Sequence, residues 1–175
     1  MNTSSSAAAR ERPTESLSIR TRRGVKRLVT GREWRAGMVI STFDVEEIMS
    51  TPNRFTVQIG RDEHAYVGYL AAANHSCDPN VVVDTTNMTM VARDDLAKGD
   101  ELSFFYPSTE WDMAAPFACR CKSADCIKLV AGARFLPSSV LEKYFLNAHI
   151  RALIVTAIDH TALHSLHLVS PDNAA

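Results

Sequence analysis

Three of the four cysteines in this chain crowd into eight positions, in the pattern Cys119-x-Cys121-x4-Cys126. A loop this short cannot build a core of its own, so a bound metal ion is a physical reason for it to be ordered. Zinc in a structural site takes four ligands in a tetrahedron, commonly four thiolates. Cys77, the remaining cysteine, lies about forty residues upstream and would complete the set. In the alternative interpretation, Cys77 is a small buried residue and the cluster binds nothing.

The beginning of the chain favours a metal over disulfides as the use of these cysteines. Residues 1–16 are rich in Ser, Ala and Arg and contain no hydrophobic run, so they predict a disordered arm rather than a secretory signal. Without secretion, two disulfides are not expected. No run of about 18 apolar residues occurs, so no membrane span is predicted. We therefore expect an intracellular protein, in the nucleus or the cytoplasm.

Charge is spread unevenly along the chain. Residues 1–35 carry a net charge of +6, and the remainder carries −7. The overall charge of −1 gives no reason to expect nucleic-acid binding. An acidic body suits a cationic partner. The alternative is a solvated surface behind a basic arm.

The sequence from residue 17 to residue 106 predicts a mostly β body of short strands. Residues 54–59 alternate polar and apolar side chains, which is typical of a half-buried strand, and residues 60–63 predict a hairpin turn after it. Further strands are predicted within 17–40, with turns at Gly24, Gly31 and Gly37, and at 81–83, 88–91 and 102–106. The predicted body is thus mostly β and built from short strands.

The character of the sequence changes after Pro107. Residues 107–134 have no clear period and contain the cysteine cluster. Ser139 and Glu142 then have the spacing of a capping box, and apolar residues recur at helical intervals after them. This pattern predicts one helix from about residue 138 to residue 158.

Three motifs resemble one protein family. Residues 74–80, Asn-His-Ser-Cys-Asp-Pro-Asn, resemble the central motif of the SET-domain protein lysine methyltransferases. Residues 99–106, Gly-Asp-Glu-Leu-Ser-Phe-Phe-Tyr, are similar to the family's second motif, usually Gly-Glu-Glu-Leu-Thr-Phe-Asp-Tyr. The cluster at 119–126 resembles the post-SET tail, whose three cysteines share a zinc ion with the cysteine of the first motif. The three occur in the family's order.

The resemblance implies a fold and a division of the chain. The fold is the mostly β, β-clip fold of SET domains, in which the Asn-His segment passes under a later loop as a pseudoknot. Residues 17–108 would form the SET-like catalytic domain and residues 109–136 the post-SET zinc-binding segment. Residues 137–175 would form a C-terminal helix and tail.

The resemblance also implies an activity and a site. The activity is transfer of a methyl group from S-adenosylmethionine to a lysine of a partner protein, of which a histone tail is one example. Tyr106 matches the family's catalytic tyrosine, while Phe104 and Tyr66 are candidates for the lysine channel. The matching zinc ligands are Cys77, Cys119, Cys121 and Cys126, and the cofactor contacts are Arg23, Gly24, Asn74, His75, Tyr106 and Phe117. A desolvating aromatic channel lowers the pKa of a lysine ammonium, which is ordinarily near 10.4.

Some positions depart from the family pattern. Phe105 stands where Asp is usual, and Arg22 stands at the first Gly of the N-terminal Gly-x-Gly element. These departures support an alternative function, a non-catalytic SET-like binding module that keeps the zinc. A third hypothesis is a zinc-based interaction domain unrelated to methyl transfer.

Overall fold

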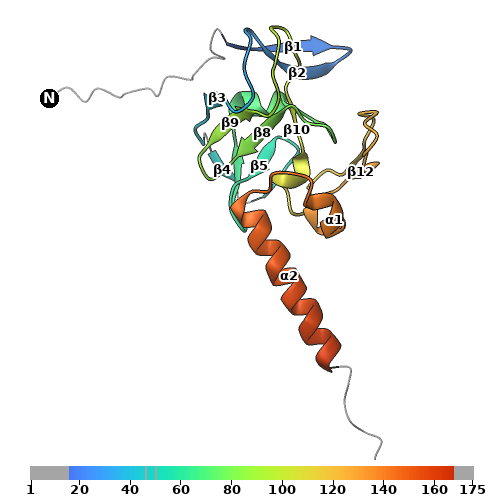
Figure 1. Cartoon of the computed structure of the whole chain (residues 1–175). Coiled ribbons are helices and arrows are strands. Elements are labelled where there is room, and N and C mark those ends of the chain that lie inside the picture. Colours follow the sequence, from blue (N-terminus) through green and yellow to red (C-terminus); the bar gives the residue numbers. More distant parts are fainter. Residues whose placement is uncertain (1–15, 46, 50, 168–175) are drawn as a thin grey trace, which may run out of the picture.

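A computed structural model describes residues 16–45, 47–49 and 51–167, with side chains through residue 159 (Figure 1). The predicted arm at 1–16 lies outside these residues except for Ser16. The elements are mostly short strands, which confirms the predicted fold class. Within the part of the chain that is described, no helix is both long enough and apolar enough to cross a membrane.

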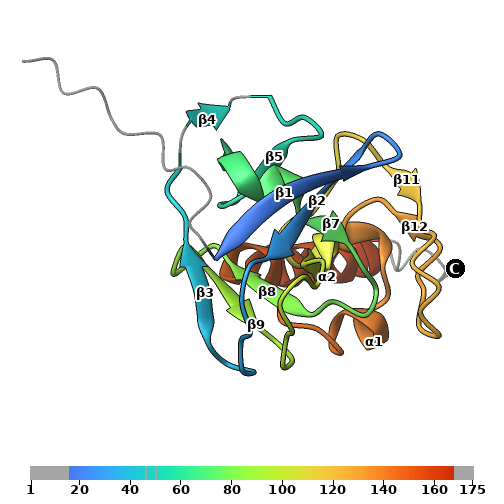
Figure 2. The same cartoon turned by 90° about the horizontal axis from the view of Figure 1, so that it is seen from above.

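The chain begins with a hairpin of β1 (Leu17–Arg22) and β2 (Val25–Thr30). Its two turn residues, Arg23 and Gly24, have φ of 52° and 78°. Positive φ at both positions is the mark of a type I′ turn, whose twist matches that of the strands. Arg22 pairs with Val25 as an ordinary strand residue, so the missing first glycine costs this turn nothing. In Figure 2 the hairpin lies across the top of the body.

Two three-stranded antiparallel sheets follow. One has the order β3-β9-β8 and the other the order β4-β6-β5. Their strands are β3 (Val39–Thr42), β8 (Val81–Asp84), β9 (Thr89–Ala92), β4 (Glu47–Met49), β5 (Thr56–Gln58) and β6 (His64–Tyr66). These confirm the strands predicted within 54–59, 81–83 and 88–91 and the hairpin turn predicted at 60–63. Inward-facing apolar side chains of both sheets, among them Val57, Ala65, Val83 and Met90, form one core.

The two motifs come together in a parallel pair of very short strands, β7 (Asn74–His75) and β10 (Ser103–Phe104). β7 follows a 3-10 helix, η1 (Gly68–Ala72). Asn80 extends the pairing: its amide nitrogen donates to Glu101 O at 2.9 Å, and its Oδ1 accepts from Ser103 N at 2.9 Å. The segments at 74–80 and 101–104 are therefore fixed side by side, as the predicted pseudoknot requires.

The strand predicted to reach Tyr106 ends two residues earlier. After Phe104 the chain turns into η2 (Tyr106–Ser108), a 3-10 helix with Pro107 near its start. Proline fixes φ near −65° and has no N–H for a sheet ladder, so Pro107 favours this turn over a longer strand. The cysteine-rich loop follows this turn in the chain. That loop pairs β11 (Phe117–Ala118) with β12 (Leu129–Val130) and leads into η3 (Ala133–Phe135).

The single helix predicted at 138–158 is wrong. The structure has a short α1 (Ser138–Leu141) and a long α2 (Ala148–His167), separated by residues 142–147. Contacts with the body hold the break. Tyr144 lies flat against Phe105, and the fully buried Asn147 donates to Val83 O at 3.0 Å and Ser108 O at 2.9 Å. Together these contacts stabilise a turn where the local pattern favours helix.

A second core joins this C-terminal region to the body. It contains the buried side chains of Phe105, Ala133, Leu141 and Ile150, with Trp111 and Tyr144 packed against them. Only the first turns of α2 reach this core, and the rest of the helix projects away from the strands (Figure 1). The post-SET segment and the C-terminal region therefore share one packing unit.

Candidate active site and metal centre

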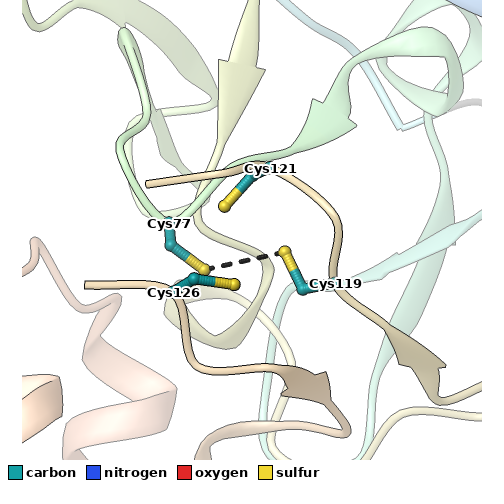
Figure 3. Close-up of side chains that lie close together, drawn as sticks. All are labelled: Cys77, Cys119, Cys121 and Cys126. Carbon is teal, nitrogen blue, oxygen red and sulfur yellow. Dashed lines mark hydrogen bonds between the residues drawn. The ribbon is translucent and has the colours of Figure 1, made fainter. Parts of the chain in front are cut away.

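The four cysteines meet at one point, although Cys77 comes from a different part of the chain (Figure 3). Their sulfur atoms all lie within 4.8 Å of one another, and Cys77 Sγ is 3.8 Å from Cys119 Sγ. A tetrahedral zinc ion with Zn–S bonds of about 2.3 Å separates its sulfur atoms by about 3.8 Å. The cysteines are free rather than disulfide-bonded. The cluster predicted from the sequence is thus formed, and its dimensions fit zinc.

His75 connects this cluster to Tyr106. Its Nε2 is 3.2 Å from Cys77 Sγ, and its Nδ1 accepts a hydrogen bond from the Tyr106 backbone N–H at 3.3 Å. Burial lowers the pKa of His75 to about 4, so the ring is neutral at physiological pH. Both ring nitrogens are therefore occupied, and His75 acts as a spacer between the cluster and Tyr106.

Tyr106 is half-buried among other aromatic rings. Its hydroxyl donates to Ala73 O at 2.9 Å, which leaves the oxygen lone pairs free to accept. The ring centroid lies 4.7 Å from Phe104 and 6.1 Å from Phe117. Burial, with a smaller effect from Glu110, raises the pKa of Tyr106 to about 12. The hydroxyl therefore stays protonated at physiological pH.

These aromatic side chains line a cavity of about 530 Å³, here called the aromatic cavity. Phe55, Phe104, Tyr106 and Phe117 contribute rings, and Asn74, His75 and Glu110 contribute polar groups. Phe105 does not line it, because its ring points to the second core. The departure at Phe105 therefore belongs to the packing of the C-terminal region and leaves the cavity wall intact.

A second cavity of about 400 Å³, here called the polar cavity, adjoins the first. Arg27, Glu101, Ser103 and Arg120 line it, and it shares Asn74, His75 and Phe117 with the aromatic cavity. Arg27 forms an ion pair with Glu101, and Asn74 Nδ2 donates to Glu101 Oε1 at 3.1 Å. Among the described residues, Arg27 Nε is buried with no hydrogen-bond partner.

The structure brings most of the predicted site residues together, but not all. Asn74, His75, Phe104, Tyr106 and Phe117 line the two cavities, and the cysteines flank them. In the first hairpin, Val25 and Arg27 line the polar cavity, whereas Arg23 and Gly24 form the turn before them. Tyr66 is exposed on β6 and lines neither cavity. The roles of Arg23, Gly24 and Tyr66 stay predictions.

Sequence reasoning missed Arg27, Glu101 and Glu110. Arg27 and Glu101 lie next to recognised motifs, so proximity to those motifs was the available signal. Glu110 gave no signal, because one acid in an irregular segment is typical of a solvated loop. In the structure it faces the aromatic cavity, and burial raises its pKa to about 7.

Comparison with known proteins agrees with this geometry. Residues 9–107 match the SET domain family. Over 87 residues the chain is 48% identical to "Methyltransferase flvH" of Aspergillus flavus. That alignment covers 49% of each protein, so the chain matches about half the length of this curated relative.

The fold also resembles a solved structure. A crystal structure of KRYPTONITE in complex with mCHG DNA and SAH aligns with a TM-score of 0.53 and 19% identity. The alignment covers 65% of this chain and 28% of that one. At this identity the likeness concerns the fold alone. The family match spans more than half of the chain and includes both motif strands, so the protein belongs to the SET domain family.

Proposed function

We propose that this protein is an S-adenosylmethionine-dependent protein-lysine methyltransferase whose cysteine-rich loop is held by a structural zinc ion. The observation that carries the proposal is the meeting of the polar and aromatic cavities at Asn74, His75 and Phe117. A group transfer between two substrates needs two binding spaces that adjoin where the reacting atoms meet. The relative named a methyltransferase supports the same reaction class.

The polar cavity suits S-adenosylmethionine. The Arg27 guanidinium is matched to a carboxylate, and Asn74, Glu101 and Ser103 are matched to amino and hydroxyl groups. When bound, S-adenosylmethionine supplies the methyl group and a positive charge that lowers the pKa of a neighbouring ammonium. The shared residues would hold it at the border with the aromatic cavity.

The aromatic cavity suits a lysine side chain. Phe55, Phe104 and Phe117 exclude water and attract a cation through their ring faces. The Tyr106 hydroxyl donates to Ala73 O, so its oxygen can accept an N–H of the substrate amine and orient the nitrogen. In this proposal the protein promotes the reaction by aligning the amine with the methyl group, and Tyr106 is the catalytic tyrosine.

The zinc ion would be structural. Cys77, Cys119, Cys121 and Cys126 would hold it, and it would fix the loop that carries Phe117 against the segment that carries His75. Four free thiols favour a reducing compartment, which supports the nucleus or the cytoplasm. The acidic remainder of the chain favours a basic protein substrate, such as a histone tail.

The test is mass spectrometry of a cell lysate incubated with the zinc-loaded protein and heavy-methyl S-adenosylmethionine. Heavy methyl groups on lysine are expected, with roughly 100-fold slower transfer for Tyr106→Phe because the amine is no longer aligned. Tyr69→Phe is the matched control: this hydroxyl donates to Thr42 O outside both cavities, so transfer should be unchanged. A folded protein that binds S-adenosylmethionine in calorimetry yet labels no lysine would instead be the non-catalytic binding module.

A further inference from the structure

Glu110 is a half-buried residue whose carboxyl group faces the aromatic cavity beside Tyr106 and Phe104. It follows η2, and its backbone is fixed at both groups: Glu110 N donates to Tyr106 O at 3.0 Å, and Glu110 O accepts from Ala133 N at 2.8 Å. The side chain therefore comes from a rigid part of the backbone. Glu110 has no part in the proposed binding of S-adenosylmethionine or in the proposed alignment of the amine.

One oxygen of the carboxyl group is held in place by its neighbours. Oε1 accepts from Gln58 N at 2.8 Å and lies 3.4 Å from Thr109 Oγ1. Gln58 is itself fixed, because its Oε1 accepts from Trp111 N at 2.8 Å and its Nε2 donates to two carbonyl groups. Over the residues that the structure describes, no hydrogen bond or ion pair reaches Oε2. The carboxyl group is thus pinned by one oxygen and presents the other to the cavity.

The other titratable groups of the cavity are unsuited to accept a proton. The Tyr106 hydroxyl is already protonated and donates to Ala73 O. Both ring nitrogens of His75 are occupied. Arg54 is a cation whose guanidinium lies 4.8 Å from the Phe55 ring centroid. His149 does not line the cavity, and its Nε2 is hydrogen-bonded to Thr109 O at 2.8 Å.

We propose that Glu110 is a catalytic base of this site: Oε2 binds the ammonium group of the substrate amine and takes one of its protons before methyl transfer. This inference rests on the proposed function. It adds that Glu110 is the proton acceptor and that the substrate amine enters the cavity as an ammonium cation. A partly desolvated carboxylate is costly, and so is a desolvated ammonium, so each lowers the cost of the other.

The step balances without a further reagent. The N–H bond breaks, its electron pair stays on nitrogen as the lone pair, and the proton forms an O–H bond with Oε2. The lone pair then forms the new C–N bond with the methyl carbon as the C–S bond of S-adenosylmethionine breaks and its electrons return to sulfur. The carboxylic acid releases its proton to water when the product leaves. Burial raises the pKa of Glu110 to about 7, which suits a base working near neutral pH.

The first test follows Glu110 itself and needs no methyl transfer. In zinc-loaded protein with ¹³C-labelled glutamate, the Glu110 carboxyl signal is identified by its absence in Glu110→Gln. We expect it to titrate near pH 7, and we expect N-acetyl-lysine amide to lower that pKa because an ammonium favours the carboxylate. N-acetyl-norleucine amide has the same chain without the amine and should leave the pKa unchanged. Equal responses to the two probes, with and without S-adenosylhomocysteine, would overturn the proposal.

The second test separates a base from a residue that only supports the fold. Glu110→Gln keeps an oxygen for Gln58 N but cannot take a proton, so kcat/KM at pH 7.5 should fall roughly 100-fold. The defect should shrink as pH rises toward 9.5, because more of the amine is already neutral. Wild-type kcat/KM should rise with pH through about 7, and Glu110→Gln should lack that step. A loss that is the same at every pH would contradict the assignment.

The controls distinguish the two proposals. Glu142→Gln makes the same change on an exposed side chain beyond α1 and should leave the profile unchanged. If wild-type protein transfers no methyl group but Glu110 responds to the lysine probe, the proposed function fails and amine binding by Glu110 stands. If wild-type protein is active and Glu110→Gln matches it at pH 7.5, only the base is overturned.

Discussion

The ring of Phe105 lies parallel to the ring of Tyr144, with 3.7 Å between their centroids and 5° between their planes. Phe105 belongs to the second SET motif, and Tyr144 lies in the break between α1 and α2. The Tyr144 hydroxyl also donates to Cys77 O at 2.8 Å. One side chain of the C-terminal region thus contacts both motifs, and the phenylalanine that departs from the family pattern is what allows the stacking.

Phe105→Asp would restore the usual family residue and should unfold the protein more easily. Phe105 is only 2% exposed, so the new carboxylate would be buried against an aromatic ring with no partner described for it. Loss of the aromatic contact and burial of a polar group together should cost about 3 kcal/mol or more of unfolding free energy. Urea unfolding followed by circular dichroism measures this. Phe145→Leu, on a more exposed neighbour, should change stability far less, and equal effects would rule out the stacking as the cause.

Cys77→Ser should release the metal and weaken S-adenosylmethionine binding together. Cys77 contributes one of four converging sulfur atoms, and its neighbour His75 lines both cavities. Asn74→Ala should weaken S-adenosylmethionine binding and leave the metal content near one zinc ion per chain. Elemental analysis gives the zinc, and titration calorimetry gives the affinity. Unchanged zinc in Cys77→Ser would show that Cys77 is no ligand.

Asn147→Ala should be among the most destabilising single changes outside the cysteines. The Asn147 amide is fully buried, and its Oδ1 accepts from Thr85 N at 2.8 Å. Its loss would also leave the carbonyls of Val83 and Ser108 without this donor. Unpaired buried groups cost on the order of 1–3 kcal/mol each, so about 3 kcal/mol or more is expected in urea unfolding. Asn87→Ala, in an exposed turn, is the control and should cost less than about 1 kcal/mol.

Stability should fall as the solution becomes acidic, in part because of His64 and His149. Burial lowers the pKa of both rings, and their proximity lowers that of His64 further. The folded state therefore binds these protons less readily than the unfolded chain. Stability is complete above the unfolded pKa of about 6.5 and is lost as pH falls through the lower folded values.

His149→Gln tests this, since a glutamine can still donate to Thr109 O but does not titrate. The melting temperature should fall less steeply below pH 6.5 in His149→Gln than in its parent. Glu110 acts in the opposite sense, because its raised pKa gives stability below about pH 4.5 that is lost as pH rises through about 7. The comparison is therefore best made in the Glu110→Gln background. Parallel pH profiles for the two proteins would contradict the histidine effect.

The sequence predicted those features that depend on local pattern or on rare residue types. The alternation of polar and apolar residues indicated the strands. The number and spacing of the four cysteines predicted that they meet in one metal site. The C-terminal helix shows the limit of such patterns. The helical spacing of its apolar residues predicts one continuous helix. The spacing does not reveal that Tyr144 stacks on Phe105 or that Asn147 is buried, and these contacts break the helix.

The candidate site also contains residues that the sequence predicts and residues that only the structure reveals. Motif residues such as Asn74, His75 and Tyr106 were recognisable because each lies in an ordered run of unusual residues. Glu110 and Arg27 were not recognisable, because the sequence does not show whether a charged side chain faces solvent or a cavity. Their chemistry comes from desolvation and from partners far away in the sequence, such as Gln58 for Glu110 and Glu101 for Arg27.

The sequence by itself therefore determined the family, the strand-rich body and the set of sulfur ligands. The family follows from three motifs that resemble those of SET domains, whereas the strand-rich body follows from strand periodicity and the sulfur ligands from the coordination preference of zinc. Only the tertiary structure decided which side chains face the two cavities, where the last helix breaks and that His75 lies between Cys77 and Tyr106. Burial sets the pKa of a carboxyl group and the cost of an unpaired amide, and burial exists only after distant segments have packed.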